Sequence, residues 1–226
     1  MKTNIIVLSV MICLMTLANN CFAQTKSITK KEYETVQRIA ESNFEKIPNI
    51  SSTKIEEYTD GKLTKTTAIS EESIPPKKMK WTEVETSGNE TTKLEIITIN
   101  YVEYRRENGD DWVKRDFSKS DEDDNSNKDG NSSGISISGE ESPNKKKHTV
   151  EQAKFNNQSV RIYSVSTVYG FEPNIVNTYR RWINSDNLIL KSEDTASEIK
   201  SRKIIRQEIV IYEYNLKNIN IEAPIK

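Results

Sequence analysis

Few side chains in this chain of 226 residues can act as nucleophiles, proton shuttles or metal ligands. It has one histidine, His148, and its two cysteines, Cys13 and Cys21, both lie near the N-terminus. Histidine-based catalysis and multi-histidine metal sites need a second imidazole or a thiolate nearby. The 34 Asp and Glu residues contain no pair that stands out as a catalytic dyad. We therefore expect no catalytic residue, no metal site, no cofactor and a protein that is not an enzyme.

Aromatic residues in predicted strands are the best candidates for ligand contacts. Large aromatic rings bury much surface and accept acyl chains without strict geometry. We expect five of them to line an apolar binding surface: Trp81, Tyr104, Trp112, Tyr179 and Trp182. The alternative is that they fill the core between a sheet and a helix, as aromatic residues in strands often do.

Three basic residues lie near these aromatic residues or near a polar stretch of the chain. Arg180 and Arg181 are candidates for binding an anionic head group, since a guanidinium can hold an oxyanion with two parallel hydrogen bonds. The alternative is pairing with glutamates on neighbouring strands. His148 follows three consecutive lysines, and we expect it to lie in solvent.

The overall charge excludes one class of partner. The chain has 33 basic and 34 acidic residues and a net charge of -1. Proteins that bind nucleic acid through its phosphates carry a clear excess of Lys and Arg, so we expect no nucleic-acid partner.

The N-terminus has the pattern of a secretory signal peptide. Lys2 precedes an apolar run from Ile5 to Leu17, and small side chains stand at Cys21 and Ala23. We expect residues 1–23 to be cleaved after Ala23, which makes the protein exported and periplasmic, with no transmembrane segment in the mature chain. An uncleaved N-terminal anchor and an acylated Cys21 are the alternatives.

Residues 118–147 are expected to form a disordered polar insert. Ile135 and Ile137 are its only apolar side chains, too few to offset the entropy cost of ordering the segment. Asn125 to Gly130 imitate the start of a calcium loop, but Ser136 stands where that loop needs a carboxylate. We interpret the insert as a solvated charge run.

One helix is expected at the start of the mature chain. Thr29 and Glu32 have the spacing of a capping box, and Pro48 would end the helix. Apolar residues recur at helical intervals on one face: Tyr33, Val36, Ile39, Ala40, Phe44 and Ile47.

About ten strands are expected after this helix. Asp60-Gly61 and Asn108-Gly109 are typical of tight hairpin turns. The predicted strands cover residues 54–58, 62–69, 78–85, 92–100, 101–106, 111–117, 159–169, 175–184, 188–193 and 203–214. The predicted fold is mainly β with an N-terminal helix: a curled antiparallel sheet, or open half-barrel, packed on the helix in one domain over residues 24–226. One helix is a small cover for so large a sheet, so part of the concave face is expected to stay open.

Four segments of the chain resemble the periplasmic lipoprotein-carrier (LolA-like) superfamily. They are Pro76–Trp81, with an aromatic residue after a basic run, the hairpin Tyr104–Lys114, the strand pair Tyr179–Lys191, and the closing segment Tyr212–Ile225. The resemblance implies an open half-barrel closed by helices and a role in carrying lipid or lipoprotein.

Two classes of function follow. In the first, the protein is an exported, non-enzymatic carrier that holds an acyl chain, a lipid or a lipoprotein on the concave face. In the second, it is an envelope interaction or sensor module that binds protein partners through a sheet edge or the polar insert.

Overall fold

The computed structural model describes residues 25–118, 145–214, 216 and 219–225. The predicted signal peptide and the calcium-like run from Asn125 to Gly130 lie outside the described residues. Cleavage after Ala23 and disorder of the insert therefore stay predictions.

The described residues form one helix and twelve strands. The helix is α2 (Lys30–Phe44). The strands are β1 (Lys26–Ser27), β2 (Asn49–Thr59), β3 (Lys62–Ile74), β4 (Lys78–Ser87), β5 (Glu90–Ile99), β6 (Val102–Glu107), β7 (Val113–Asp116), β8 (Lys145–Phe155), β9 (Gln158–Val168), β10 (Ile175–Ile183), β11 (Ile189–Glu198) and β12 (Ile204–Tyr214). Every strand pairing is antiparallel, which confirms the expected mainly β, antiparallel class.

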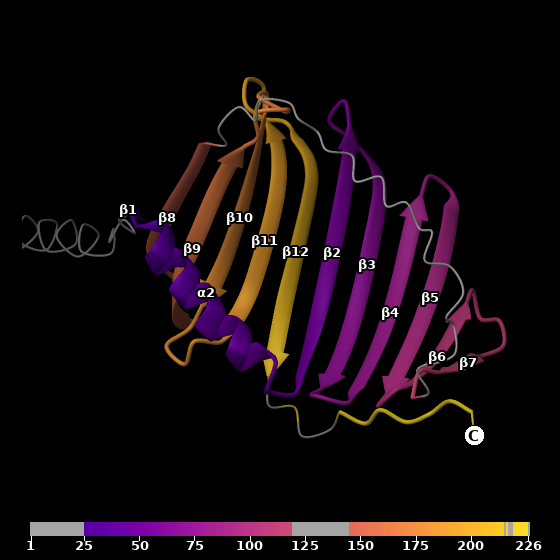
Figure 1. The fold of residues 1–226 in the computed structure, drawn as a ribbon. Coiled ribbons are helices and arrows are strands. Elements are labelled where there is room, and N and C mark those ends of the chain that lie inside the picture. Colours follow the sequence, from indigo (N-terminus) through magenta and orange to yellow (C-terminus); the bar gives the residue numbers. More distant parts are fainter. Residues whose placement is uncertain (1–24, 119–144, 215, 217–218, 226) are drawn as a thin grey trace, which may run out of the picture.

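All twelve strands belong to one sheet that does not close on itself. Their order is β1-β8-β9-β10-β11-β12-β2-β3-β4-β5-β6-β7, so β1 and β7 form its two edges (Figure 1). The pairing of β12 with β2, from Asn49 to Glu57, joins the first and last long strands of the chain. In contrast, β7 and β8, which follow each other in the sequence, lie near opposite edges.

The predicted hairpin turns are confirmed by their backbone angles. Asp60 and Gly61 have φ values of 52° and 76°, and Asn108 and Gly109 have 48° and 85°. Residues with positive φ at both central positions give a turn whose twist matches that of the flanking strands. These connections set the register of β2 with β3 and of β6 with β7.

Helix α2 begins as predicted. The Thr29 hydroxyl accepts a hydrogen bond from the Glu32 backbone N–H at 3.2 Å, and the Glu32 carboxylate accepts one from the Thr29 N–H at 2.8 Å. The helix ends at Phe44, four residues before Pro48. The predicted apolar face is partly wrong, because Ile39 is 42% exposed while Gln37 is buried.

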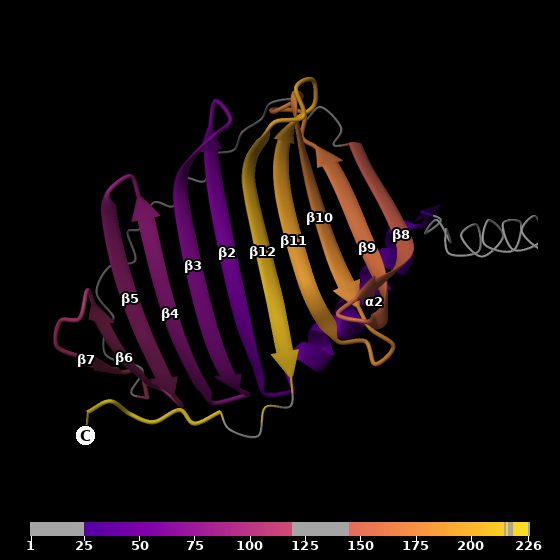
Figure 2. The same cartoon turned by 180° about the vertical axis from the view of Figure 1, so that it is seen from behind.

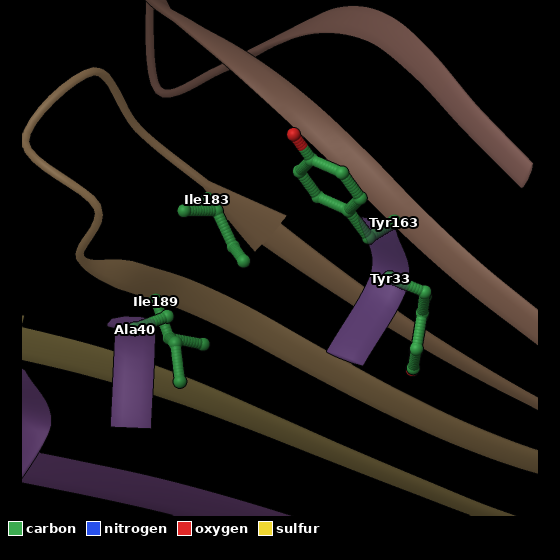
Figure 3. Packing of buried hydrophobic residues seen from close by; sticks show 5 residues of the cluster. All are labelled: Tyr33, Ala40, Tyr163, Ile183 and Ile189. Atoms are coloured by element: carbon green, nitrogen blue, oxygen red, sulfur yellow. The ribbon is translucent and has the colours of Figure 1, made fainter. Parts of the chain in front are cut away.

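Helix α2 crosses the sheet from β8 towards β12 (Figure 1). We call the side of the sheet that α2 crosses the helix face, and the other side the opposite face. Five buried side chains form a cluster between α2 and the helix face: Tyr33, Ala40, Tyr163, Ile183 and Ile189 (Figure 3). This cluster anchors the helix over β9 to β11.

The C-terminal segment packs on the opposite face. Ile221 is 1% exposed and shares a buried cluster with Ile97 and Tyr104. The Lys78 ammonium donates a hydrogen bond to the Ile221 carbonyl at 3.3 Å. Figure 2 shows this segment running past the ends of the strands towards β6 and β7.

Two strands were not predicted. Lys145–Lys147, assigned to the insert, begin β8 and pair with Val168 to Ser166 of β9. Residues 145–154 alternate poorly between polar and apolar, so the segment did not resemble a strand. Its pairing with β9 depends on tertiary context, as strand formation by weakly patterned sequences usually does. The second missed strand, β1, has two residues.

Candidate functional site

The strand alternation separates the two candidate arginines. Successive residues of a strand point to opposite faces. On β10, Tyr179 and Arg181 lie on the helix face, while Arg180 and Trp182 lie on the opposite face. Arg180 and Arg181 therefore cannot bind the same head group on one face.

Arg181 is occupied by contacts within the protein. Its guanidinium donates hydrogen bonds to Gln37 at 2.7 Å and Glu41 at 2.6 Å, both on α2, and a third to the Tyr179 hydroxyl. The guanidinium also lies 5.0 Å from the centre of the Tyr179 ring. The Arg181 side chain is 17% exposed, and its donors tie α2 to β10.

The burial around this contact changes the ionisation of nearby tyrosines. Burial raises the pKa of Tyr33, on α2, to about 12. It also raises the pKa of Tyr179, against the opposing effect of the Arg181 charge. Desolvation disfavours the charged phenolate, so both hydroxyls stay neutral and able to donate hydrogen bonds.

Arg180 is also paired, on the opposite face. It forms an ion pair with Glu151 at 2.8 Å and lies 5.0 Å from the Trp182 ring centre. Trp182 is 8% exposed in a cluster with Val160 and Ile162. Lys191 covers its ring at 4.4 Å. In this structure Trp182 is enclosed by the protein's own side chains.

Tyr104 and Trp112 lie together, away from the helix. Tyr104 is 6% exposed beside Ile221, and Trp112 packs against the same cluster. The Arg106 guanidinium lies 4.6 Å from the Trp112 ring centre. The C-terminal segment therefore covers this part of the opposite face.

Trp81 is the predicted aromatic residue on a part of the helix face that α2 does not cross. On β4 it lies between Glu71 of β3 and Ile96 of β5. Its neighbours on this face form what we call the β2–β5 patch: Ile55, Ile69, Trp81, Leu94 and Ile96. All five are partly exposed. Among the described residues, none of the five belongs to a buried cluster.

One carboxyl beside the β2–β5 patch is partly desolvated. Burial raises the pKa of Glu71, which is opposite Ser51 and Trp81 in the ladder. Within residues 25–118 and 145–225, its side chain forms no hydrogen bond or ion pair. A carboxyl responds in this way where its surroundings are apolar, even without a covering element.

The structure thus divides the five predicted ligand contacts between two faces. Trp81 and Tyr179 lie on the helix face, whereas Trp182, Tyr104 and Trp112 belong to clusters with residues of the opposite face. Whether any of them binds a ligand stays a prediction. The aliphatic members of the β2–β5 patch were missed, although counting alternate residues along β2 to β5 would have placed them with Trp81.

A separate groove lies between α2 and the strands β8 to β11. It has a volume of about 320 Å³, and its walls include Tyr33 and His148. The prediction that His148 lies in solvent is wrong, because it belongs to β8 and is partly buried. Its ring centre is 5.1 Å from that of Tyr33.

Two further features of the part of the chain that the structure describes bear on function. No group of three or more His, Cys, Asp and Glu side chains there is placed to hold a metal ion. Its helix is neither long nor apolar enough to cross a membrane.

Several solved structures resemble this fold weakly. LprF from Mycobacterium bovis has 7% identity and a TM-score of 0.44, with 89% of this chain and 100% of that chain covered. The LolA superfamily protein NE2245 from Nitrosomonas europaea has 6% identity and a TM-score of 0.29, with 83% and 94% covered. A putative outer membrane lipoprotein-sorting protein domain from Vibrio parahaemolyticus has 8% identity and a TM-score of 0.28, with 83% and 95% covered.

These similarities, one of them to a LolA superfamily protein, are weak and structural only. No protein-family model and no curated protein matches the sequence. Since similarity this weak carries no functional conclusion, the chemistry has to be inferred from the residues of the chain itself.

Proposed function

We propose that this is an exported, non-enzymatic protein that binds the acyl chain of a lipid or lipoprotein on the β2–β5 patch. The observation that supports this most directly is the run of aliphatic and aromatic side chains on β2 to β5 beyond the reach of α2. Apolar faces of this kind on soluble domains commonly serve as binding surfaces. Burial also raises the pKa of Glu71, which lies directly beside Trp81 in the ladder.

Charged side chains share this face with the patch. Glu85 is paired with Lys65 at 2.9 Å, near one end of the β3–β4 ladder. Glu83 lies between Ile69 and Leu94 in the ladder, and Glu71 lies beside Trp81. An acyl chain gains affinity from burial alone, so it needs no charged partner in the patch.

Tryptophan fluorescence can test this proposal with an internal control. Bromine atoms on an acyl chain quench nearby indoles. A Trp112→Phe, Trp182→Phe variant keeps Trp81 in the patch, whereas a Trp81→Phe, Trp112→Phe variant keeps Trp182 on the opposite face. We expect saturable quenching by a brominated fatty acid in the first variant and little in the second. Equal quenching in both, or none, would contradict the proposal.

A second pair of variants tests the aliphatic contacts. Ile96→Thr retains a β-branched side chain and removes apolar surface, so we expect it to weaken fatty-acid binding about threefold to tenfold. Ala68→Thr is the matched control, because Ala68 is exposed and points to the opposite face. Equal affinities of the two variants would exclude the patch as the binding surface.

A protein-binding role is the second candidate, and one observation favours it. Three large apolar side chains are exposed along the edge strand β7: Tyr101 at 68% and Phe117 at 59% next to each other at its end, and Val113 at 56% at its start. Exposed apolar residues beside an unpaired edge can add a strand from a partner. A Val113→Thr, Phe117→Ser variant should then lose binding to the protein partner and keep fatty-acid binding. If the protein is only a carrier, these substitutions should change neither kind of binding.

A further inference from the structure

The groove between α2 and the sheet contains polar side chains from four different elements. Lys30 comes from the first turn of α2, Lys146 and His148 from β8, Thr167 from β9 and Asn177 from β10. Groups so distant in the sequence converge here because α2 crosses these strands at their β8 side (Figure 1).

The strand register brings three of these side chains into one row. Lys146 is directly opposite Thr167, and Thr167 is directly opposite Asn177. Side chains directly opposite in antiparallel strands have Cβ atoms about 4.5–5.5 Å apart. A small group in the groove could therefore contact all three at once.

These side chains have no partners within the protein. In the described ranges 25–118 and 145–225, Lys146, Thr167 and Asn177 form no side-chain hydrogen bond or ion pair. Thr167 is nonetheless 7% exposed. Lys146 is exposed, and the Thr167 hydroxyl is not among the buried polar atoms that lack a partner, so these donors are open to solvent or to a ligand that enters the groove.

Lys30 is also available to a ligand. Its contact with Glu34 is 3.5 Å long, and both side chains are highly exposed, at 71% and 61%. Exposed pairs of this kind contribute little free energy and exchange easily. The two arginines that the sequence suggested for an anion are, in contrast, both held by carboxylates of the protein.

We propose that the groove binds a phosphate group, with Lys30 and Lys146 as the two cations and Thr167 and Asn177 as neutral donors. A phosphate carries about -1.5 to -2 charges and three acceptor oxygens, which matches two cations and two neutral donors better than a carboxylate does. Lysine binds phosphate as a point charge and needs no rigid bidentate geometry.

Of the two acidic side chains of the groove, Asp194 lies apart from this end and Glu34 lies beside Lys30. Asp194 is on β11, opposite Tyr179, two strands away from Thr167. Glu34 contacts Lys30 from the next turn of α2. The groove is therefore polarised, with its cations at the β8 side and Asp194 at the β11 side.

His148 gives a direct readout of the site. It lines the groove and is the single histidine among 226 residues, so its imidazole C–H resonances in an NMR spectrum belong to one side chain. We expect inorganic phosphate, added at constant ionic strength and pH, to shift these resonances along a saturable curve.

Two lysine variants separate a specific site from general attraction. Lys146→Gln should weaken phosphate binding at least tenfold, because it removes one of two cations. Lys147→Gln is the matched control, since Lys147 pairs with Ser166 and points to the opposite face. A curve that does not saturate, or that is the same in both variants, would overturn the proposal.

The phosphate could be free or belong to a lipid head group, and the second case rests on the proposed function. A short-chain lysophosphatidic acid below its critical micelle concentration distinguishes the two. Strand β9 of the groove and strand β5 of the patch are seven steps apart in the sheet, about 34 Å at about 4.8 Å a step, so this lipid cannot reach both. Tighter binding of the lipid than of inorganic phosphate would indicate a head-group site with apolar contacts of its own beside the groove, and Ile96→Thr should leave both affinities unchanged. Failure of acyl binding with saturable phosphate binding would overturn the proposed function and support a site for free phosphate.

Discussion

Arg180, Arg181 and their neighbours show how much the surroundings of a side chain decide its availability. By residue type, the two arginines were equal candidates for an anion. Alternation places them on opposite faces, and each meets a carboxylate of the protein, Glu151 for Arg180 and Glu41 for Arg181. The separation could have been predicted, since it follows from the period of a strand. The partners could not, because Glu41 and Arg181 are 140 residues apart in the chain.

A tyrosine in this contact region should make stability depend on pH. The ordinary pKa of 10.0 applies to Tyr33 in the unfolded chain, while burial raises its pKa to about 12 in the folded protein. Between these values the unfolded state loses a proton that the folded state keeps. The contribution of Tyr33 is therefore present below pH 10 and is lost as pH rises towards 12.

Urea unfolding at pH 9 and pH 11 measures this effect. Tyr33→Phe cannot ionise, so its unfolding free energy should fall less over this interval than that of the wild type, by about 1 kcal/mol. Tyr101→Phe is the control, because Tyr101 is 68% exposed and should follow the wild type. The same fall in both variants would contradict the role of Tyr33.

The C-terminal segment shows how an irregular element can stabilise the sheet. Ile221 fills the cluster around Ile97 and Tyr104, although the segment has no helix or strand of its own. Ile221→Ala should lower the unfolding free energy by about 2 to 4 kcal/mol, as large-to-small changes in cores do. Ile225→Ala should cost less than about 0.5 kcal/mol, since Ile225 is 39% exposed.

Chemical denaturation of these two variants provides the measurement. If Ile221→Ala and Ile225→Ala lower the unfolding free energy by similar amounts, Ile221 does not anchor the segment. The fluorescence of Trp112, which packs against the same cluster, should report the loosening in the Ile221→Ala variant alone.

Local elements were predictable from the sequence, and distant ones were not. The turns at Asp60-Gly61 and Asn108-Gly109 were found because glycine and its neighbour determine the backbone there. The β8 strand was missed because its residues acquire their strand character by pairing with β9. Ile221 covers Tyr104, although the two residues are 117 positions apart in the chain. No local sequence pattern predicts such a contact.

At the level of the whole molecule, the strand order sets a length requirement on the connection from β7 to β8. Ten strand-to-strand steps separate them in the sheet. At about 4.8 Å a step, the path along the sheet is roughly 48 Å. The stretch expected to be an insert between two strands therefore connects strands near opposite edges of the sheet.

Replacing residues 119–144 with four residues should disturb the fold. Four residues reach about 14 Å at most, so β7 or β8 would have to leave the sheet. A Gly/Ser linker of 26 residues, the same length as the 119–144 stretch, should leave the unfolding free energy within about 0.5 kcal/mol of the wild type. Wild-type stability of the four-residue variant, measured by urea unfolding, would contradict the strand order.

The crossed placement of α2 and the C-terminal segment has one more consequence. Residues 25–118 supply α2, which packs on strands of the second half, and residues 145–225 supply Ile221, which packs on strands of the first. The ladder between β2 and β12 joins the halves in the middle of the sheet. The two halves therefore hold each other through reciprocal contacts, as the fragments of a complementing split protein do. A backbone cut between residues 118 and 145 would leave every one of these contacts intact.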